Sequence, residues 1–170
     1  PVADLNTNVN NPIIGRRSFG SDTELVIPIL THFIQGLQDN GVMATAKHFP
    51  GHGDTSADSH IELPIVSYPR ERLDSVEFAP FMAAINASVD VTMVSHIWFT
   101  AFDDREIPAS LSSRIVTGLL RDEMGYDGII MTDALDMDAI DTAYTPGGSA
   151  IQAILAGNDL IAIGAHVGTR

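Results

Sequence analysis

The sequence predicts an α/β protein built around a parallel sheet. Short apolar runs alternate with longer stretches in which apolar residues recur every three or four positions, as in repeated βα units. The short runs are continuously apolar, which is typical of strands covered on both faces of a parallel sheet. Polar side chains follow directly after several of these runs. Repeated βα units form a doubly wound sheet or a (β/α)8 TIM barrel.

Five strands are expected from the apolar runs, at residues 1–5, 42–46, 90–95, 128–132 and 159–163. A complete barrel has eight strands and typically about 250 residues. If the units belong to a barrel, the chain is a partial barrel of about five βα units. It would form one domain over residues 1–170, with the first strands missing. Such a piece leaves strand edges unpaired, which would favour association through the exposed barrel edges.

Helices are expected at residues 23–38, from about 70 to 86, at 113–124 and at 149–156. Ser21 or Asp22 can cap the first of them, and Ser112 can cap the third. Gly147 and Gly148 are expected to form a turn ahead of the last helix. Each helix therefore connects two of the expected strands, which completes the βα pattern.

Composition limits the partners of the chain. The formal net charge is −13, which argues against nucleic acid and against an anionic membrane surface. The absence of cysteine excludes disulfides and thiol nucleophiles. No apolar run is long enough for a transmembrane helix, and no signal peptide is visible. Because the chain begins with Pro1 and not with Met, the compartment stays open between cytoplasm and export.

The stretch from Lys47 to His60 concentrates titratable side chains. It holds three histidines, one lysine and two aspartates, and its glycines and proline interrupt regular structure. The stretch directly follows the strand expected at 42–46. Loops fixed on a rigid scaffold are where catalytic groups concentrate, so this stretch is the first candidate for a site.

Polar side chains also follow the other expected strands. Asp4 lies at the end of the strand expected at 1–5, and His96 and Asp133 come directly after those at 90–95 and 128–132. Ligands of such folds bind at the carboxyl ends of the strands. One pocket is therefore expected to collect these residues together with Lys47 and His48.

Each candidate has a structural alternative. Asp133 can act as a nucleophile, or it can cap a helix that begins near Ala134. His60 follows Asp58 by two residues, so a carboxylate could orient its ring for acid/base chemistry; otherwise it is an ordinary loop histidine. Ser59 beside them suggests a Ser-His-Asp triad, but adjacent residues rarely reach that geometry and no Gly-x-Ser-x-Gly elbow is present.

The remaining candidates concern metals and ligands. His48 and His52 are four residues apart, a spacing that suits zinc on a helix, but the intervening proline and glycine break a helix and no metal site is expected. Lys47 could pair with a carboxylate or hold a ligand oxygen. Arg17 could bind a ligand or lie on a glycine-rich surface turn. The aromatic residues near Trp98 could stack on a sugar or form a small loop core.

Together these segments resemble glycoside hydrolase family 3, in its bacterial β-N-acetylglucosaminidase branch. The strongest match is Lys47-His48-Phe49-Pro50-Gly51-His52-Gly53-Asp54-Thr55 continuing to Asp58-Ser59-His60. Supporting segments are Asn11-Pro12-Ile13-Ile14-Gly15, Arg17-Ser18-Phe19-Gly20, Ser95-His96-Ile97, Thr132-Asp133-Ala134-Leu135 and Ala156-Gly157-Asn158-Asp159. The motifs keep the family's order along essentially the whole chain.

The resemblance implies a (β/α)8 barrel and retaining hydrolysis through a covalent glycosyl-enzyme. By the family's pattern, Asp133 is the nucleophile, and His60 with its partner Asp58 is the general acid/base. The side chains that would bind the sugar are Arg17, Lys47 and His48. The implied substrates carry terminal β-linked N-acetylglucosamine, as muropeptides of cell-wall turnover do, and no cofactor is implied.

The chain departs from the family in one respect. The family's early barrel strands, with an Asp-x-Glu-Gly-Gly-type segment that also contacts the sugar, do not occur in it. The isolated chain is therefore expected to be inactive, unstable or aggregated. Two other functions stay open: a noncatalytic carbohydrate-binding piece of a barrel, and a zinc hydrolase that uses His48, His52 and His60.

Overall fold

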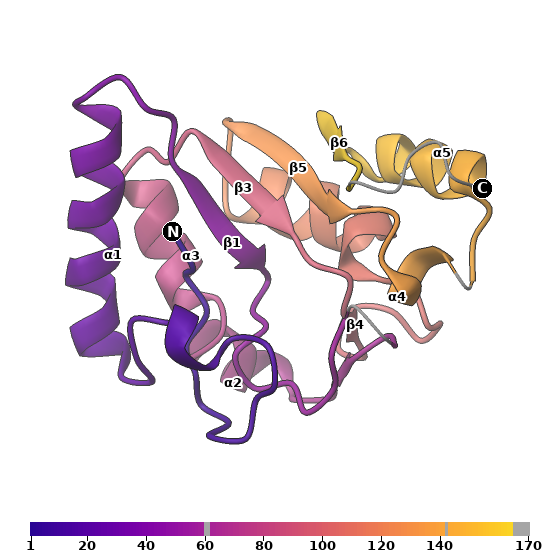
Figure 1. Cartoon of the computed structure of the whole chain (residues 1–170), viewed down its shortest axis with the longest axis horizontal. Coiled ribbons are helices and arrows are strands. Elements are labelled where there is room, and N and C mark those ends of the chain that lie inside the picture. The colour runs from indigo at the N-terminus through magenta and orange to yellow at the C-terminus, as the bar shows by residue number, and fades with distance from the viewer. Residues whose placement is uncertain (60–61, 142, 165–170) are drawn as a thin grey trace.

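A parallel sheet forms the centre of the molecule. The computed structural model describes residues 1–59, 62–141 and 143–164. The strands of the main sheet follow one another in chain order: β1 (Thr45–Phe49), β3 (Val91–Val94), β5 (Ile129–Ala134) and β6 (Leu160–Ala162) (Figure 1). Every neighbouring pair is parallel. The α/β class predicted from the sequence is confirmed.

The N-terminal segment adds a further parallel pairing at the edge of β1. Val2 forms an isolated parallel bridge with Lys47. The Ala3 amide donates to the Lys47 carbonyl over 2.6 Å, and the Lys47 amide donates to the Pro1 carbonyl over 3.1 Å. The strand predicted at 1–5 is thus present in a shorter form. Sequential parallel strands in this order are what consecutive βα units of a barrel produce.

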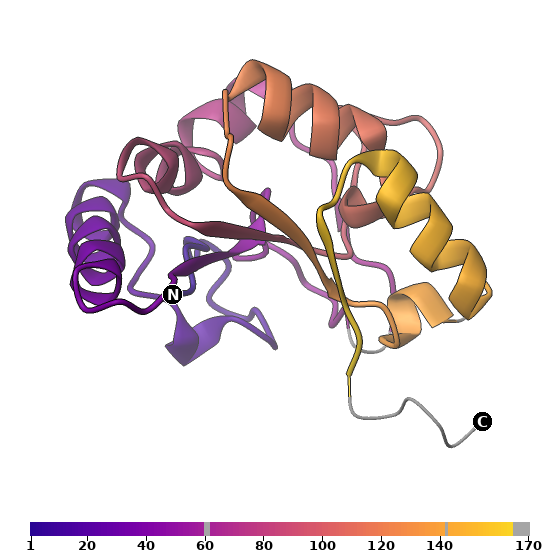
Figure 2. The same ribbon diagram turned by 90° about the horizontal axis from the view of Figure 1, so that it is seen from above.

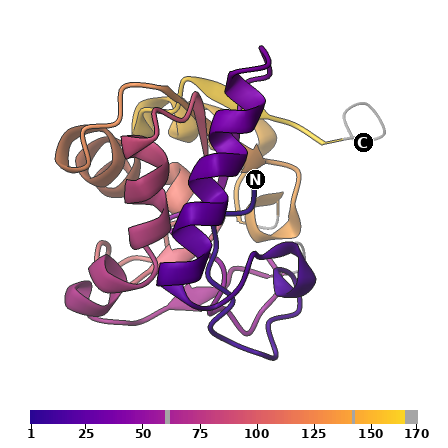
Figure 3. The same ribbon diagram turned by 90° about the vertical axis from the view of Figure 1, so that its left-hand side faces the viewer.

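Helices cover one face of the sheet. The helices of the fold are α1 (Thr23–Gln38), α2 (Arg70–Ser75), α3 (Ala79–Asn86), the π-helix η3 (Arg114–Glu123), α4 (Asp138–Asp141), which lies beyond the carboxyl ends of the strands (Figure 1), and α5 (Pro146–Ala156). Figure 2 shows α1, α3, η3 and α5 arranged around the convex side of the curved sheet. Figure 3 shows α1 running beside α3, with which it packs.

Short elements complete the fold. A second sheet pairs β2 (Ile65–Val66) with β4 (Trp98–Phe99) in parallel. Two single turns of 3-10 helix are η1 (Gly15–Arg17) and η2 (Ala109–Leu111). Among the described residues, no helix combines the length and the apolarity that crossing a membrane requires.

The two faces of the main sheet differ in burial. One row of residues in register across the strands is almost completely buried on the helix side: Ala46, Thr92 and Ile130. The next row points to the opposite face and is only half-buried: Lys47, Met93 and Met131. In a βα barrel this second face is the interior. The described residues do not close it, so side chains on this face can reach solvent.

A phenylalanine cluster fixes the end of β1 against the helices. Phe49 is fully buried, and its ring lies 5.3 Å from Phe81 in an edge-on contact and 6.3 Å from Phe78. Burying each such ring contributes roughly 1.5–3 kcal/mol. The residues just before Phe49 are therefore held at a defined place on the sheet.

One helix prediction is confirmed and another is wrong. Asp22 caps α1 as expected, because its side chain accepts a hydrogen bond from the Glu24 amide over 2.9 Å. The single helix predicted from about 70 to 86 is wrong, since the chain forms α2 and α3 with a break between them. Pro80 lies in the first turn of α3, where its missing amide hydrogen does not break a helical bond.

Two turn predictions are also wrong. Ser112 does not cap η3; Ser113 occupies the N-cap position, and the Ser112 hydroxyl has no partner among the described residues. Gly147 and Gly148 do not form a separate turn but belong to the first turn of α5. The Thr145 hydroxyl caps this helix by accepting a hydrogen bond from the Gly148 amide over 3.2 Å. A glycine pair is compatible with a helix start when a side chain supplies the cap.

The strand predicted at 42–46 is shifted along the chain by three residues. Val42 and Met43 are 53% and 57% exposed and precede β1. Lys47 and His48 lie within β1 rather than after it, and the pairing with β3 becomes irregular between Lys47 and Phe49. Backbone pairing and the burial of Phe49 set the register of this strand, whereas its hydrophobicity alone suggested an earlier start.

The outermost helices, α1 and α5, expose apolar side chains near the two lateral edges of the sheet. The exposed positions are Leu25, Ile29 and Phe33 on α1, and Ile151, Ile154 and Leu155 on α5. Association of the chain through its barrel edges stays a prediction, and these residues are the ones that such a contact would cover.

The loop that follows β1, residues 50–59, which we call the motif loop, passes close to the N-terminal segment at Gly53 and gives a first prediction. A Cβ at Gly53 would lie 1.7 Å from the Leu5 carbonyl oxygen, whereas a Cβ at Gly36 of α1 would meet nothing. We expect Gly53→Ala to lower the free energy of unfolding by about 2 kcal/mol or more. The matched control Gly36→Ala should raise it by about 1 kcal/mol. Urea denaturation measures both, and equal effects of the two changes would contradict the close approach.

Candidate active site

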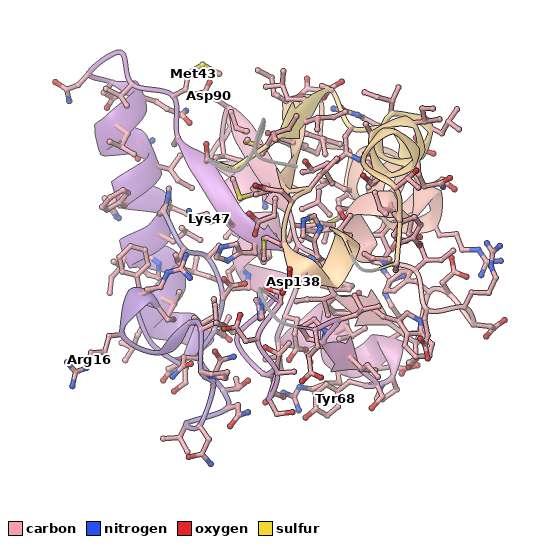
Figure 4. All side chains as sticks on the ribbon, turned by 45° about the vertical axis from the view of Figure 1, so that its right-hand side comes forward. Arg16, Met43, Lys47, Tyr68, Asp90 and Asp138 are labelled. Carbon is pink, nitrogen blue, oxygen red and sulfur yellow. The ribbon has the colours of Figure 1, made fainter. Side chains whose placement is uncertain are left out.

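The polar side chains expected in one pocket lie at one end of the sheet. In Figure 4, Lys47 lies on β1 and Asp138 lies beyond the carboxyl ends of the strands, while Met43 and Asp90 mark the opposite end. Asp133 is the second-last residue of β5, at the same end as Asp138. The carboxyl ends of the strands therefore carry the candidate residues, as the βα pattern predicts.

A buried carboxylate connects the N-terminal segment to β1. Asp4 is 1% exposed, and it accepts three hydrogen-bond donors from two histidines. The donors are the His48 amide at 3.1 Å, the His48 Nδ1 at 2.8 Å and the His52 amide at 2.7 Å. Burial raises the pKa of Asp4, but the contacts with His48 and His52 outweigh it and hold this pKa below its ordinary value.

The same carboxylate orients the His48 ring. Because a carboxylate only accepts, the ring nitrogen Nδ1 carries the proton and donates to Asp4. The other nitrogen, Nε2, lies 3.4 Å from Nη2 of Arg17, which donates to it. Arg17 is exposed in η1, and its Nη1 donates to the Ile13 carbonyl over 3.5 Å. The structure thus brings together two of the predicted sugar-binding residues.

Lys47 lies one residue away from His48 and on the open face of the sheet. Its side chain is half-buried, and within the described ranges no carboxylate oxygen comes within ion-pair distance of its ammonium group. Of the two interpretations drawn from the sequence, the described residues favour a lysine that holds a ligand oxygen.

Asp133 is presented by a strand and not by a helix. β5 continues through Ala134, and the next helix, α4, begins at Asp138. The alternative that Asp133 caps a helix near Ala134 is therefore wrong. The carboxylate is half-buried, and its Oδ1 accepts a hydrogen bond from the Ala134 amide over 2.8 Å. One oxygen is thereby fixed.

His96 stabilises the backbone next to Asp133 through a hydrogen bond. It is completely buried, and its Nε2 donates to the Ala134 carbonyl over 2.9 Å. Its Nδ1 therefore accepts from the Ser110 hydroxyl over 2.7 Å. Burial lowers the pKa of His96, and the nearby Asp133 carboxylate only partly opposes this. A neutral His96 thus holds the backbone that carries Asp133, rather than facing the pocket as the sequence suggested.

His52 anchors the loop after β1 through two side-chain hydrogen bonds. The ring is buried, with Nδ1 2.7 Å from the Thr55 hydroxyl and Nε2 2.9 Å from the Ser59 hydroxyl. Burial lowers the pKa of His52, against the opposing effect of Asp4. Asn11 adds bonds from its side-chain amide to the carbonyls of His52 and Thr55, at 2.8 and 3.0 Å. The sequence indicated this loop as a site but did not indicate these anchors.

The predicted acid/base pair lies on this loop. Asp58 is half-buried and directly precedes the buried Ser59. His60 lies outside the described residues. The histidine that Ser59 contacts is His52, whose other nitrogen meets the Thr55 hydroxyl and not a carboxylate. This contact therefore does not make a Ser-His-Asp triad.

A zinc site at these histidines lacks preformed ligands. Both ring nitrogens of His52 are engaged by hydroxyl groups, and those of His48 face Asp4 and Arg17. Over the described part of the chain, no group of three or more His, Cys, Asp or Glu side chains could hold a metal ion.

The aromatic residues after β3 form a small loop core. Phe99 is fully buried, and the Trp98 indole donates to the Asp103 carbonyl over 2.8 Å. Phe102 packs 6.0 Å from Phe78. Of the two interpretations drawn from the sequence, these contacts favour the small loop core.

Sequence comparison identifies relatives along the whole chain. The model of the glycosyl hydrolase family 3 N terminal domain matches residues 1–167. Beta-hexosaminidase A from Pseudoalteromonas piscicida is 37% identical over 171 residues, which cover 94% of this chain and 29% of that protein. The beta-hexosaminidase of Tolumonas auensis is 39% identical over 162 residues, which cover 95% of this chain and 47% of that protein.

Solved structures give the same result for the fold. A glycoside hydrolase family 3 beta-N-acetylglucosaminidase from Paenibacillus sp. str. FPU-7 superposes with a TM-score of 0.94 at 52% identity, over 96% of this chain and 31% of that chain. The beta-N-acetylhexosaminidase from Beutenbergia cavernae superposes with a TM-score of 0.90 at 31% identity, over 98% of this chain and 50% of that chain. The chain thus spans between 29% and 50% of the length of these relatives.

The support that His96 gives to the strand end leads to a second prediction. In His96→Leu the Ala134 carbonyl and the Ser110 hydroxyl lose their buried partner, so we expect the free energy of unfolding to fall by about 3 kcal/mol at pH 7.5. The matched control is His32→Gln on the exposed side of α1, which should change it by less than about 0.5 kcal/mol.

The difference between wild type and His96→Leu should also depend on pH. The unfolded chain takes up a proton at this histidine below about pH 6.5, whereas the lowered pKa keeps the folded ring neutral. The wild type therefore loses stability as the pH falls below 6.5, by up to about 1.4 kcal/mol per pH unit from this group. The leucine variant lacks this loss, so the difference in the free energy of unfolding between the two proteins should be smaller at pH 5.5 than at pH 7.5. A larger difference at pH 5.5 would contradict a neutral buried His96.

Proposed function

The chain belongs to glycosyl hydrolase family 3, and from this premise we propose that it carries the main catalytic groups of a β-N-acetylglucosaminidase. The carrying observation is that Arg17, His48 and Asp133 lie at the same end of one parallel sheet, each fixed by named hydrogen bonds. Relatives that bear the name beta-hexosaminidase support a hydrolase of β-linked N-acetylhexosamine.

The sugar would be held on the open face of β1. Arg17 and Lys47 offer N–H donors to its hydroxyl and acetamido oxygens, and neither has a carboxylate partner among the described residues. His48 is held in one orientation by Asp4, so its edge beside Arg17 is a fixed recognition element. Fixed donors discriminate between sugars better than mobile ones, because their orientation is set before binding.

Asp133 would be the nucleophile. The Ala134 amide fixes its Oδ1, which leaves Oδ2 for attack on the anomeric carbon. In the first step, the bond from the carboxylate to the anomeric carbon forms while the glycosidic C–O bond breaks, and a general acid protonates the leaving oxygen. In the second step, water attacks the anomeric carbon, its proton returns to the base, and the free carboxylate is regenerated.

The acid and base would be His60, oriented by Asp58. The family resemblance supports this role, together with the spacing of two residues between the two side chains. An imidazole can donate a proton in the first step and accept one in the second near neutral pH. The loop that carries the pair begins beside His48 and would close over the bound sugar.

The natural substrates we propose are muropeptides that end in β-linked N-acetylglucosamine. The partner of the chain would then be a carbohydrate, and no nucleic acid or cofactor is involved in the steps above. Terminal sugars suit a site in which donors from η1 and β1 converge on one ring, whereas a site for long chains needs further sugar-binding positions.

The third prediction tests the nucleophile. In the full-length protein, Asp133→Ala should lower kcat on 4-nitrophenyl N-acetyl-β-glucosaminide by about 10⁴-fold or more, because the covalent step is lost. The matched control Asp127→Asn, an exposed carboxylate at the opposite end of the sheet, should change kcat by less than about twofold.

Other outcomes of this assay separate the competing functions. Unchanged turnover in Asp133→Ala would refute the nucleophile. A full-length wild type that binds N-acetylglucosamine but never cleaves the substrate would instead be a noncatalytic carbohydrate-binding protein. Activity that disappears on exhaustive chelation would favour the zinc hydrolase.

A further inference from the structure

We propose that His52 is a positioning residue for the acid/base loop, which it holds in place through the hydroxyl of Ser59. This inference rests on the proposed function, in which Asp58 and His60 supply the general acid/base. His52 itself would touch neither the sugar nor the reacting atoms. Its effect would pass through Ser59, which stands between those two residues in the chain.

The side chain of His52 is held on both sides of its ring. The bond from Nε2 to the Ser59 hydroxyl measures 2.9 Å and joins residues seven apart, so it closes the loop on itself. The bond from Nδ1 to the Thr55 hydroxyl measures 2.7 Å. Both partner residues are buried, at 2% and 1% exposure. A buried hydrogen bond of this kind costs about 1–3 kcal/mol to leave unpaired, so the loop is biased strongly toward this arrangement.

The backbone of His52 is fixed as well. Its amide donates to Oδ1 of Asp4 over 2.7 Å, and its carbonyl accepts from the Asn11 side chain over 2.8 Å. Asp4 also binds His48, whose ring meets the His52 ring edge-on at 5.9 Å between centroids. The anchor of the loop and the sugar-binding histidine are therefore fixed by the same carboxylate.

A second contact joins Asp58 to a residue further along the chain. The Glu62 amide donates to the Asp58 carbonyl over 3.0 Å. Asp58 and Ser59 are thus each held by a hydrogen bond, the first through its carbonyl and the second through its hydroxyl.

This geometry has a consequence for catalysis. A general acid must lie within hydrogen-bond reach of the leaving oxygen, and a displacement of about 1 Å can cost roughly 100-fold in rate. Losing the anchor would displace the acid without removing it. The loss should therefore be large for substrates that need protonation and small for those that do not.

The test uses two alanine variants of the same loop. Ser59→Ala removes only the hydroxyl that meets Nε2 of His52. The matched control is Ser56→Ala, which removes an exposed hydroxyl three residues earlier. Two substrates are compared in the purified full-length protein: N,N′-diacetylchitobiose, whose leaving group needs a proton, and 2,4-dinitrophenyl N-acetyl-β-glucosaminide, whose leaving group does not.

The expected result is a loss in Ser59→Ala that depends on the leaving group. On diacetylchitobiose, kcat/KM should fall about 10- to 100-fold, while the pre-steady-state rate of dinitrophenolate release, which reports only the first step, changes by less than about twofold. Ser56→Ala should match the wild type on both substrates. Equal losses of Ser59→Ala on both substrates would overturn the positioning role, because a general structural defect affects both.

Hydrogen exchange gives a readout that does not depend on turnover. Amides of residues 53–59 should exchange faster in Ser59→Ala than in Ser56→Ala, while those of β3 stay unchanged. Unchanged exchange in the loop would overturn the anchor even if the protein is an active hydrolase. A wild type that cleaves neither substrate would overturn the proposed function, and exchange would still decide whether His52 anchors the loop.

Discussion

The arrangement of the site depends on one buried carboxylate. Asp4 ends the N-terminal strand and accepts hydrogen bonds from the backbone and ring of His48 and from the backbone of His52. An unpaired carboxylate at this depth would be strongly unfavourable, so the three donors must converge on it. The first strand, the end of β1 and the motif loop are therefore fixed relative to one another.

Hydrogen bonds connect Asp4 to two regions of the candidate site. Through His48 it orients a ring edge that meets Arg17, and this region would recognise the sugar. Through His52 it connects to Ser59 and to the loop that would supply the proton. Asp133 is positioned separately, because His96 binds the carbonyl of the next residue, Ala134. In the proposed function, substrate recognition and proton transfer would thus both depend on Asp4, whereas the nucleophile would not.

The sequence was a good guide to elements and a poor guide to contacts. The order of strands and the boundaries of α1 followed from apolar periodicity, and the polar residues after the strands predicted where the site lies. The start of β1 was misplaced, because the burial of Phe49 and pairing with residues 1–3 set it. The contact of Asp4 with His48 joins residues 44 apart, so no local pattern could indicate it.

Exchange of individual backbone amides in Asp4→Ala tests the role of this carboxylate most directly. The His48 and His52 amides donate to Asp4 in the wild type, and their protection should fall together by about 10- to 100-fold when the acceptors are removed. The Val94 amide in β3 should keep its protection. If both histidine amides stay as protected as in the wild type, Asp4 does not hold the site together.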